Sequence, residues 1–339
     1  MAKIQVDTNN KAIMLNNKAL LAQEFIGIPR ELVSGTMQQP AGNYTYTLPD
    51  AVTALGGYAL YSAFYGDKKL TRVNMNNLTT VSGVYALASA FQSATGLLSA
   101  DFSKITSLGY TQCMASAFYS CSALTDVDFS SLATITGANA LSTAFRACSS
   151  LTQLNFPSLV TINASNAISS ICRGCTSLVT FAIPELQTMT GSSAMANAFQ
   201  DCSALTNISF PKLKTIGTDN SGTNNSHLSG FLQSSPNITT LTFPELEKIY
   251  CNGSTTGSYG TFANNVYLEK LYFPKLNTIT YGTGASAANK NACKNTFYGC
   301  SALTELHFAA TNKTAIEATD GYATAWGRGA GNVTIYFDL

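Results

Sequence analysis

The sequence predicts an α/β solenoid, an elongated array of about nine 27-residue units that each contain a strand, a turn and a short helix. A leucine recurs with five equal steps of 27 residues, at Leu70, Leu97, Leu124, Leu151, Leu178 and Leu205. The register then continues with steps of 33, 30 and 35 residues, through Ile238, Leu268 and Leu303. Self-similarity at a period of roughly 20 to 50 residues is the signature of a repeat architecture, and it argues for one elongated body.

The two ends of the chain differ from the array. Near the N-terminus, IQVD and AIMLN flank TNNK, which is typical of a β-hairpin, and Pro29 and Pro40 indicate a linker. We expect residues 1–43 to form a β-hairpin cap or a docking segment with this linker, because an exposed strand edge readily pairs with another chain. The array then covers residues 44–308, and residues 309–339 form a C-terminal cap that ends in the strand VTIYF.

Each unit begins with a strand. In the unit that starts at Leu124, Val127 and Phe129 alternate with two aspartates, as in a half-buried strand. A proline directly follows this strand in five units, at Pro157, Pro184, Pro211, Pro244 and Pro274. Because proline has no N–H to donate, it marks where pairing between units stops or bends. A second apolar pair, Leu132 and Ile135, comes next, and we expect the chain to turn there.

The rest of the unit predicts a short amphipathic helix. In GANALSTAFRACSSL the apolar side chains are spaced by three and four positions: Leu141, Ala144, Phe145, Cys148 and Leu151. This spacing places them on one stripe of a helix about three turns long. Phenylalanines at the Phe145 position predict a buried ladder of Phe64, Phe91, Phe118, Phe145, Phe199, Phe262 and Phe297. One unit cannot bury its own apolar face, so the units are expected to stack around a continuous core.

The recurring phrase AF-x-x-C-S-A-L-T-x-L-x-F-P-x-L-x-T-I resembles the BspA-like leucine-rich repeat family. One copy contains Ala198, Phe199, Cys202, Leu205, Phe210, Pro211, Leu213 and Ile216. The resemblance covers roughly residues 44 to 308 and implies a right-handed leucine-rich repeat array. The chain departs from the family in its longer unit, in Cys172 at the aromatic position, and in Ser235 and Asn265 at the cysteine position.

The resemblance also implies a function. Such repeats occur in bacterial surface proteins that bind host or neighbouring-cell ligands and in tail proteins of bacteriophages. The segments ELVSGTMQQPAGNYTYTLPDAVTALGG and DGYATAWGRGAGNVTIYFDL look like the phage type. The resemblance therefore implies a non-enzymatic module on a virion tail or an extracellular surface that binds a bacterial receptor, with a bacterial surface adhesin as the alternative. Its partners would be a cell-surface protein or glycan, other virion or surface-assembly subunits through residues 1–43, and possibly a second copy of the chain.

The composition argues against several other partners. Charged residues make up 11% of the chain, against roughly 25% in an ordinary soluble protein, and the net charge is +1. This balance provides no electrostatic attraction for nucleic acid or an anionic membrane. The sequence also shows no secretory signal peptide and no stretch of about 18 apolar residues. We expect neither a nucleic-acid nor a membrane partner.

The cysteines and histidines predict no cofactor, metal or catalytic site. Five of the nine cysteines share one repeat position: Cys121, Cys148, Cys175, Cys202 and Cys300. Side chains stacked in parallel do not meet with disulfide geometry, so we expect buried free thiols. The CRGC segment has no second CxxC or nearby histidine to complete a zinc site. His227 falls in a loop and His307 at an outward, solvated or ligand-facing strand position, and neither has a nucleophile and an acid beside it in the sequence. We therefore expect no enzyme.

Binding is expected where the repeat lengthens. The three long steps all insert residues between the second apolar pair and the predicted helix, after Ile216, Ile249 and Ile279. Insertions at a constant repeat position emerge on one edge of a solenoid, and loops on a rigid scaffold often carry recognition. The candidate ligand-binding residues are Asn220, Asn224, His227, Tyr250, Asn252, Tyr259, Tyr281, Asn289 and Lys290. The alternative is that these insertions are merely tolerated.

A second candidate surface is the row of outward strand residues. It consists of Asp101, Asp128, Asn155, Ser209, Thr242, Tyr272 and His307. This row lacks a stripe of aromatic residues, so the insertions are the preferred site.

Overall fold

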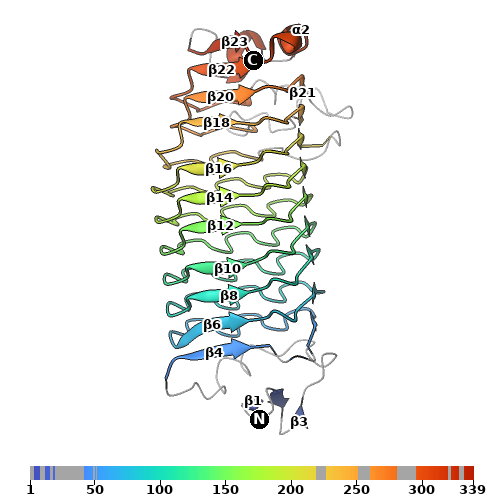
Figure 1. Ribbon diagram of the computed structural model, residues 1–339, viewed down its shortest axis with the longest axis vertical. Helices are drawn as coiled ribbons and strands as arrows, with labels where there is room; N and C mark the ends of the chain where they lie inside the picture. Colours follow the sequence, from blue (N-terminus) through green and yellow to red (C-terminus); the bar gives the residue numbers. More distant parts are fainter. Residues whose placement is uncertain are drawn as a thin grey trace.

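The computed structural model describes residues 4–7, 12–15, 18–19, 42–48, 50, 52–218, 227–250, 260–280, 295–319, 322–327 and 332–339. The described array is a tall stack of about nine coils in which each strand lies parallel to the one below it (Figure 1). The solenoid predicted from the 27-residue period is therefore confirmed.

The first strand of each coil is where the alternating pattern predicts it. These strands are β4 (Tyr44–Thr47), β6 (Leu70–Asn74), β8 (Ser99–Asp101), β10 (Asp126–Asp128), β12 (Gln153–Asn155), β14 (Thr180–Ala182), β16 (Asn207–Ser209), β18 (Thr240–Thr242), β20 (Lys270–Phe273) and β22 (Glu305–Phe308). They are hydrogen-bonded in three groups, with breaks between β10 and β12 and between β16 and β18. Val127 pairs with Ala100, its equivalent 27 residues earlier. The 27-residue repeat in the sequence therefore sets which residues of neighbouring strands are paired.

Each coil also contains a second strand, which the sequence did not predict. Where we expected only a turn, at Leu132 and Ile135, the chain forms β11 (Thr134–Ile135). Its equivalents are β5 (Ala54–Leu55), β7 (Thr80–Val81), β9 (Ser107–Leu108), β13 (Thr161–Ile162), β15 (Thr188–Met189), β17 (Thr215–Ile216), β19 (Lys248–Tyr250) and β21 (Thr278–Thr280). Together they make one parallel sheet of nine strands. A strand of two or three residues is too short to show an alternation of apolar and polar residues, so the sequence pattern did not predict it.

The predicted helix in each unit is wrong. Between Asn139 and Cys148 the backbone forms a series of tight turns instead. Every fourth residue has a left-handed conformation, with φ of 55° at Asn139, 56° at Thr143 and 59° at Ala147. The amide of Ala144 donates to Leu141 three residues earlier (3.1 Å), whereas the next amide, that of Phe145, donates to Ile171 of the following coil (2.9 Å). Alternate amides therefore pair within the coil and between coils.

The apolar spacing that suggested a helix has another cause. The buried residues of this segment recur with a period of four: Ala140 and Leu141, Ala144 and Phe145, then Cys148. An α-helix has 3.6 residues per turn, so the two periods differ by about 40° of rotation for every four residues. Over three turns both periods predict the same buried residues. The burial predicted from this spacing is correct, although the backbone conformation is not.

The phenylalanine ladder runs through the core as predicted. Phe64, Phe91, Phe118 and Phe145 stack with ring centroids 5.4, 5.3 and 5.2 Å apart. A second row of phenylalanines follows the first strands, and Phe129 packs edge-on against Phe145 at 6.3 Å. These side chains are buried, so the rings form a continuous apolar column along the rod.

The chain ends are built differently from the coils. At the N-terminus, β1 (Ile4–Asp7), β2 (Ala12–Leu15) and β3 (Lys18–Ala19) form a separate antiparallel sheet. After β22 come the 3-10 turn η3 (Ala310–Asn312), the helix α2 (Lys313–Glu317), the turn η4 (Tyr322–Gly327) and the strand β23 (Thr334–Phe337). In η4, Trp326 is fully buried and packs against Phe297 and Phe308 at 6.0 Å each. β23 pairs in parallel with β22 and so adds one more strand to its sheet.

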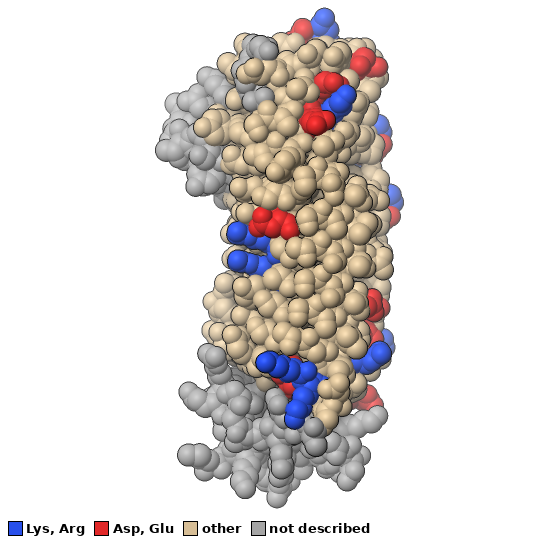
Figure 2. Space-filling view, turned by 90° about the vertical axis from the view of Figure 1, so that its left-hand side faces the viewer, with Lys and Arg blue, Asp and Glu red and all other residues tan. Residues whose placement is uncertain are grey.

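The face of the rod shown in Figure 2 carries few charged side chains. The ion pairs that link successive coils on the exterior include Lys212 to Glu185 and Lys275 to Glu245, both at 2.7 Å. Exposed pairs of this kind contribute little to stability. None of the helices in the described part of the chain is long and apolar enough to cross a lipid bilayer.

Candidate functional site

The three insertions start from neighbouring strands. β17, β19 and β21 are adjacent in the nine-stranded sheet, where Ile216 pairs with Ile249 and Ile249 pairs with Ile279. Each insertion begins within two residues of the end of its strand. Adjacent strands lie about 4.8 Å apart, so the three starting points are stacked along one line.

The insertions also return to the rod at stacked positions. The Leu228 amide donates to the Thr261 carbonyl at 2.8 Å, and the Phe262 amide donates to the Thr296 carbonyl at 2.9 Å. The residues before and after each insertion are therefore held against their equivalents in the next coil. We call the line of these starting and returning residues the insertion edge.

The structure describes two of the nine candidate ligand-binding residues. Tyr250 is half-buried at the end of β19. His227 is fully buried, so its assignment to the ligand-binding surface is wrong: it follows an insertion in sequence, yet it already belongs to the core of the coil. The other seven lie outside the described residues: Asn220, Asn224, Asn252, Tyr259, Tyr281, Asn289 and Lys290.

Burial of His227 predicts acid sensitivity. Burial lowers the pKa of this imidazole from 6.5 to about 4. A histidine whose folded pKa is depressed binds more protons when unfolded, so stability falls as the pH drops from about 6.5 towards 4. At pH 4.5 the loss relative to neutral pH should be about 2–3 kcal/mol. Urea unfolding at pH 7 and pH 4.5 measures it.

The matched variant for this test is His227→Leu, which removes the titrating group from the buried position. We expect the difference in unfolding free energy between pH 7 and pH 4.5 to be smaller in the variant, whatever its absolute stability. An identical pH dependence in both proteins would contradict a buried neutral imidazole.

The row of outward strand residues ends in a stack of three rings. Tyr272 of β20, His307 of β22 and Tyr336 of β23 occupy paired positions on the outer face of the sheet. The ring centroids of Tyr272 and His307 are 4.3 Å apart, and those of His307 and Tyr336 are 4.6 Å apart, with interplanar angles of 15° and 10°. His307 is 7% exposed, so the expected solvated position is wrong: the two tyrosine rings cover its faces.

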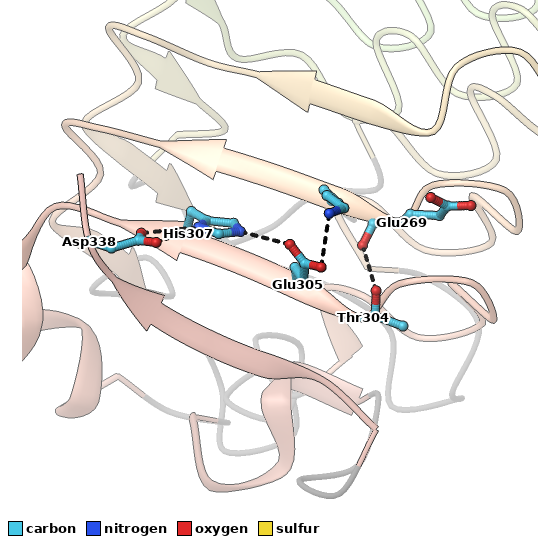
Figure 3. Close-up of polar contacts among 6 residues, drawn as sticks. Glu269, Thr304, Glu305, His307 and Asp338 are labelled. Carbon is cyan, nitrogen blue, oxygen red and sulfur yellow. Dashed lines mark hydrogen bonds and ion pairs between the residues drawn. The ribbon is translucent and has the colours of Figure 1, made fainter.

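Both nitrogens of His307 contact carboxylates (Figure 3). Nδ1 lies 3.0 Å from Asp338 Oδ1, and Nε2 lies 3.1 Å from Glu305 Oε2. The other oxygen of Glu305 binds Lys270 Nζ at 2.9 Å. The hydrogen bond from Lys270, followed by that from His307, holds the pKa of Glu305 below its usual range, and Glu305 in turn raises the pKa of Lys270. A continuous row of polar contacts thus crosses β23, β22 and β20. Its members are Asp338, His307, Glu305 and Lys270.

This arrangement is suited to holding strands together. Ionised carboxylates only accept hydrogen bonds, so an imidazole nitrogen of His307 that carries a hydrogen donates it to the carboxylate beside it. His307 lies in β22 and Asp338 follows β23, so their contact fastens the last strand to the array, whereas the Lys270–Glu305 pair joins β20 to β22. The ring nitrogens of His307 are directed at these carboxylates and not at a hydroxyl or thiol that a base would activate.

The sequence reasoning missed this ring stack because Tyr336 was assigned to a separate cap. The outward row was expected to lack a stripe of aromatic residues, which is wrong at its C-terminal end. The sequence does contain a signal for this stack. In TIYF of β23, inward and outward residues alternate as they do in ELHF of β22, and Tyr336 takes the position of His307. Elsewhere in the row the polar residues have local roles, since Asp101 and Asp128 each accept the amide two residues later, from Ser103 and Ser130, at 2.9 and 2.8 Å.

The cysteine ladder is structural. The seven cysteines in the described residues are free and buried. Cys121, Cys148, Cys175, Cys202 and Cys300 each donate Sγ–H to a carbonyl of the preceding coil at 3.0–3.1 Å. Ser235 replaces cysteine in one coil and donates to the equivalent carbonyl, that of Phe199, at 2.5 Å. Asn265 replaces it in another coil and binds the preceding coil through other atoms: its amide nitrogen donates to Leu228 O at 3.0 Å, and its oxygen accepts the Leu232 amide at 2.9 Å. This position therefore selects small donors that join coils.

Burial makes the thiols of Cys121 and Cys113 less reactive. It raises the pKa of Cys121 to about 12 and that of Cys113 to about 11, so the reactive thiolate is scarce at neutral pH. Among the described residues, no group of three or more histidine, cysteine or acidic side chains is placed to hold a metal ion.

Comparisons with solved structures identify other leucine-rich repeat proteins. One from Bacteroides ovatus is 17% identical over 89% of this chain and 70% of its own, with a TM-score of 0.40. One from T. pallidum is 22% identical over 49% of this chain and 69% of its own, with a TM-score of 0.35. One from Eubacterium ventriosum is 16% identical over 78% and 66%, with a TM-score of 0.27. No curated protein matches the chain.

The family comparison covers most of the array. The family described as BspA type leucine-rich repeat region matches in six copies, over residues 44–194, 115–252 and 175–291. These overlapping matches include the strands from β4 to β21, the ladder from Phe64 to Phe262 and most of the cysteine positions described above. The chain therefore belongs to the BspA-type leucine-rich repeat family.

Proposed function

We propose that this chain is a recognition module on a phage tail or virion surface, and that it binds a protein or glycan receptor on a bacterial cell through the insertion edge. Leucine-rich repeat proteins generally bind other proteins, which supports the broader role. The observation that carries the proposal is the stacking, in adjacent coils, of the residues that come directly before and after the three insertions.

The physical basis is a rigid support beneath variable loops. Each coil is tied to the next by backbone hydrogen bonds and buried rings, so neighbouring insertions have their ends held at constant separation. Binding loops on such scaffolds lose less conformational freedom when they engage a ligand. The insertions contain asparagine, serine, glycine and tyrosine, a composition suited to adaptable polar contacts.

The bacterial adhesin is the second candidate function, since the repeat itself is shared by both kinds of protein. In either case residues 1–43 would join the chain to other subunits, and a homo-oligomer is compatible with that role. Immunodetection separates the two: we expect the chain in purified virus particles, whereas recovery only from bacterial cell envelopes would favour the adhesin.

The binding proposal is tested by replacing residues 219–226, 251–259 and 281–294 with glycine and serine at unchanged length. The replacement stops before His227 and Leu228, because both are buried core residues. We expect the melting temperature to change by only a few degrees and binding of labelled protein to a panel of intact bacterial cells, read by flow cytometry, to be lost.

The matched control changes two exposed residues away from the insertion edge, Thr125→Ala directly before β10 and Gln153→Ala in β12. This variant should bind cells as the unmodified chain does. If the loop replacement folds and still binds cells with unchanged strength, the insertion edge is not the receptor site.

A further inference from the structure

Three tyrosines on the first coils form a cluster that belongs neither to the core nor to the insertions. The rings of Tyr58 and Tyr85 stack at 5.1 Å, and Tyr61 meets them edge-on at 5.8 and 6.1 Å. Tyr58 is 45% exposed, and Tyr110 and Val84 on neighbouring coils are 46% and 39% exposed. Exposed apolar groups gathered in this way usually mark a binding surface.

The backbone beneath the cluster is unfavourable for tyrosine. Tyr58 and Tyr85 have φ of 59° and 56°, in the left-handed region that bulky side chains rarely adopt. The equivalent position of the next four coils also has positive φ, and it is occupied by smaller or amide side chains: Gln112, Asn139, Asn166 and Ser193. Asparagine tolerates this conformation better than tyrosine does. Folding alone would therefore favour asparagine here, and strained residues of this kind cluster at functional sites.

The cluster lies on the same side of the coil as the insertion edge. Tyr85 comes four residues after Val81, the end of β7, and its amide donates to Thr111 of the next coil. The insertions begin at the equivalent place, just after β17, β19 and β21. The N-terminal coils thus present tyrosines where the C-terminal coils carry longer loops.

We infer that Tyr58, Tyr61 and Tyr85 form a binding site for neutral pyranose sugars. An aromatic ring has an electron-rich face that attracts the partly positive C–H face of a pyranose, and the tyrosine hydroxyls can exchange hydrogen bonds with sugar hydroxyls. None of the three clustered tyrosines, nor the exposed Val84 and Tyr110 on neighbouring coils, is an Asp, Glu, Lys or Arg, so these residues offer no ion pair to an anionic or cationic ligand. Rings in two nearly perpendicular planes suit a sugar chain better than a flat aromatic ligand.

The site is independent of the proposed receptor binding at the insertion edge, because it uses other residues at the other end of the array. The test measures saturation-transfer NMR signals from maltohexaose, cellohexaose and chitohexaose with the full chain at pH 7. We expect at least one neutral oligosaccharide to bind and the double variant Y58N/Y85N to weaken that binding at least tenfold. The melting temperature of the double variant should be unchanged or higher, since asparagine fits the left-handed position.

Tyr298, which is 43% exposed in a later coil, provides the matched control, and Tyr298→Asn should leave sugar binding unchanged. Absence of signal from all three oligosaccharides overturns the inference, as does a signal that survives Y58N/Y85N. Self-association of the chain that is lost in Y58N/Y85N, without any sugar signal, would assign the cluster to a second copy and also overturn it. Replacing residues 219–226 should leave sugar binding intact, so the two binding proposals fail separately.

Discussion

Replacing Gly137 with alanine is expected to destabilise the middle of the rod by about 3 kcal/mol, because the new methyl group would collide with backbone. A Cβ at this position would lie 2.2 Å from the Tyr110 carbonyl oxygen and 2.7 Å from the Tyr110 nitrogen. These atoms belong to the preceding coil, so relief requires two coils to separate. Urea unfolding should show the loss, and hydrogen exchange should show it first in the coils around Gly137.

Gly109→Ala is the matched control for this effect. The added Cβ there would approach only Thr136 Oγ1, at an ordinary contact distance of 3.6 Å. We expect its unfolding free energy to remain within about 0.5 kcal/mol of the unmodified chain. Equal destabilisation by both substitutions would show that loss of glycine itself, and not the close approach of coils, is responsible.

Phe145→Ala is expected to cost about 3–5 kcal/mol of unfolding free energy, which is typical of deleting a fully buried ring. Phe145 is inaccessible to solvent, stacks on Phe118 at 5.2 Å and meets Phe129 edge-on. The loss combines the transfer free energy of the ring with the cavity left in the column. In a repeat protein the damage can separate the two halves of the array, so denaturant unfolding should also lose cooperativity.

The control for this prediction is Tyr267→Ala, which removes an aromatic ring that is 43% exposed. Its cost should stay near or below 1 kcal/mol, because much less surface leaves the solvent on folding. If Phe145→Ala proved as mild as Tyr267→Ala, the ladder would not be a main source of stability.

Much of this fold could be predicted from the chain alone. A constant step of 27 residues brings each residue beside its equivalent in the next coil, and the pairing of Val127 with Ala100 follows that step. The strand alternation, the phenylalanine ladder and the buried free cysteines are local patterns that repeat, so each copy strengthens the same prediction. The insertions after Ile216, Ile249 and Ile279 were likewise visible as breaks in the step.

The wrong predictions have a common physical origin. The segment around Phe145 was expected to be helical, but half of its amides find their partners in the next coil, and a period of four resembles 3.6 over three turns. The second strand has two or three residues and exists because its neighbours in adjacent coils pair with it. His227 was placed in a loop because the insertion precedes it, although its position already belongs to the core.

The sequence by itself determined the number and length of the coils and which side chains face inward, because the repeat enforces the same environment in every copy. Only the tertiary structure decided the turn conformation, the second sheet and the Tyr272, His307 and Tyr336 stack. These features depend on hydrogen bonds and ring contacts between residues about 30 positions apart. Such contacts form when one coil settles on another, so a pattern within a single coil does not specify them.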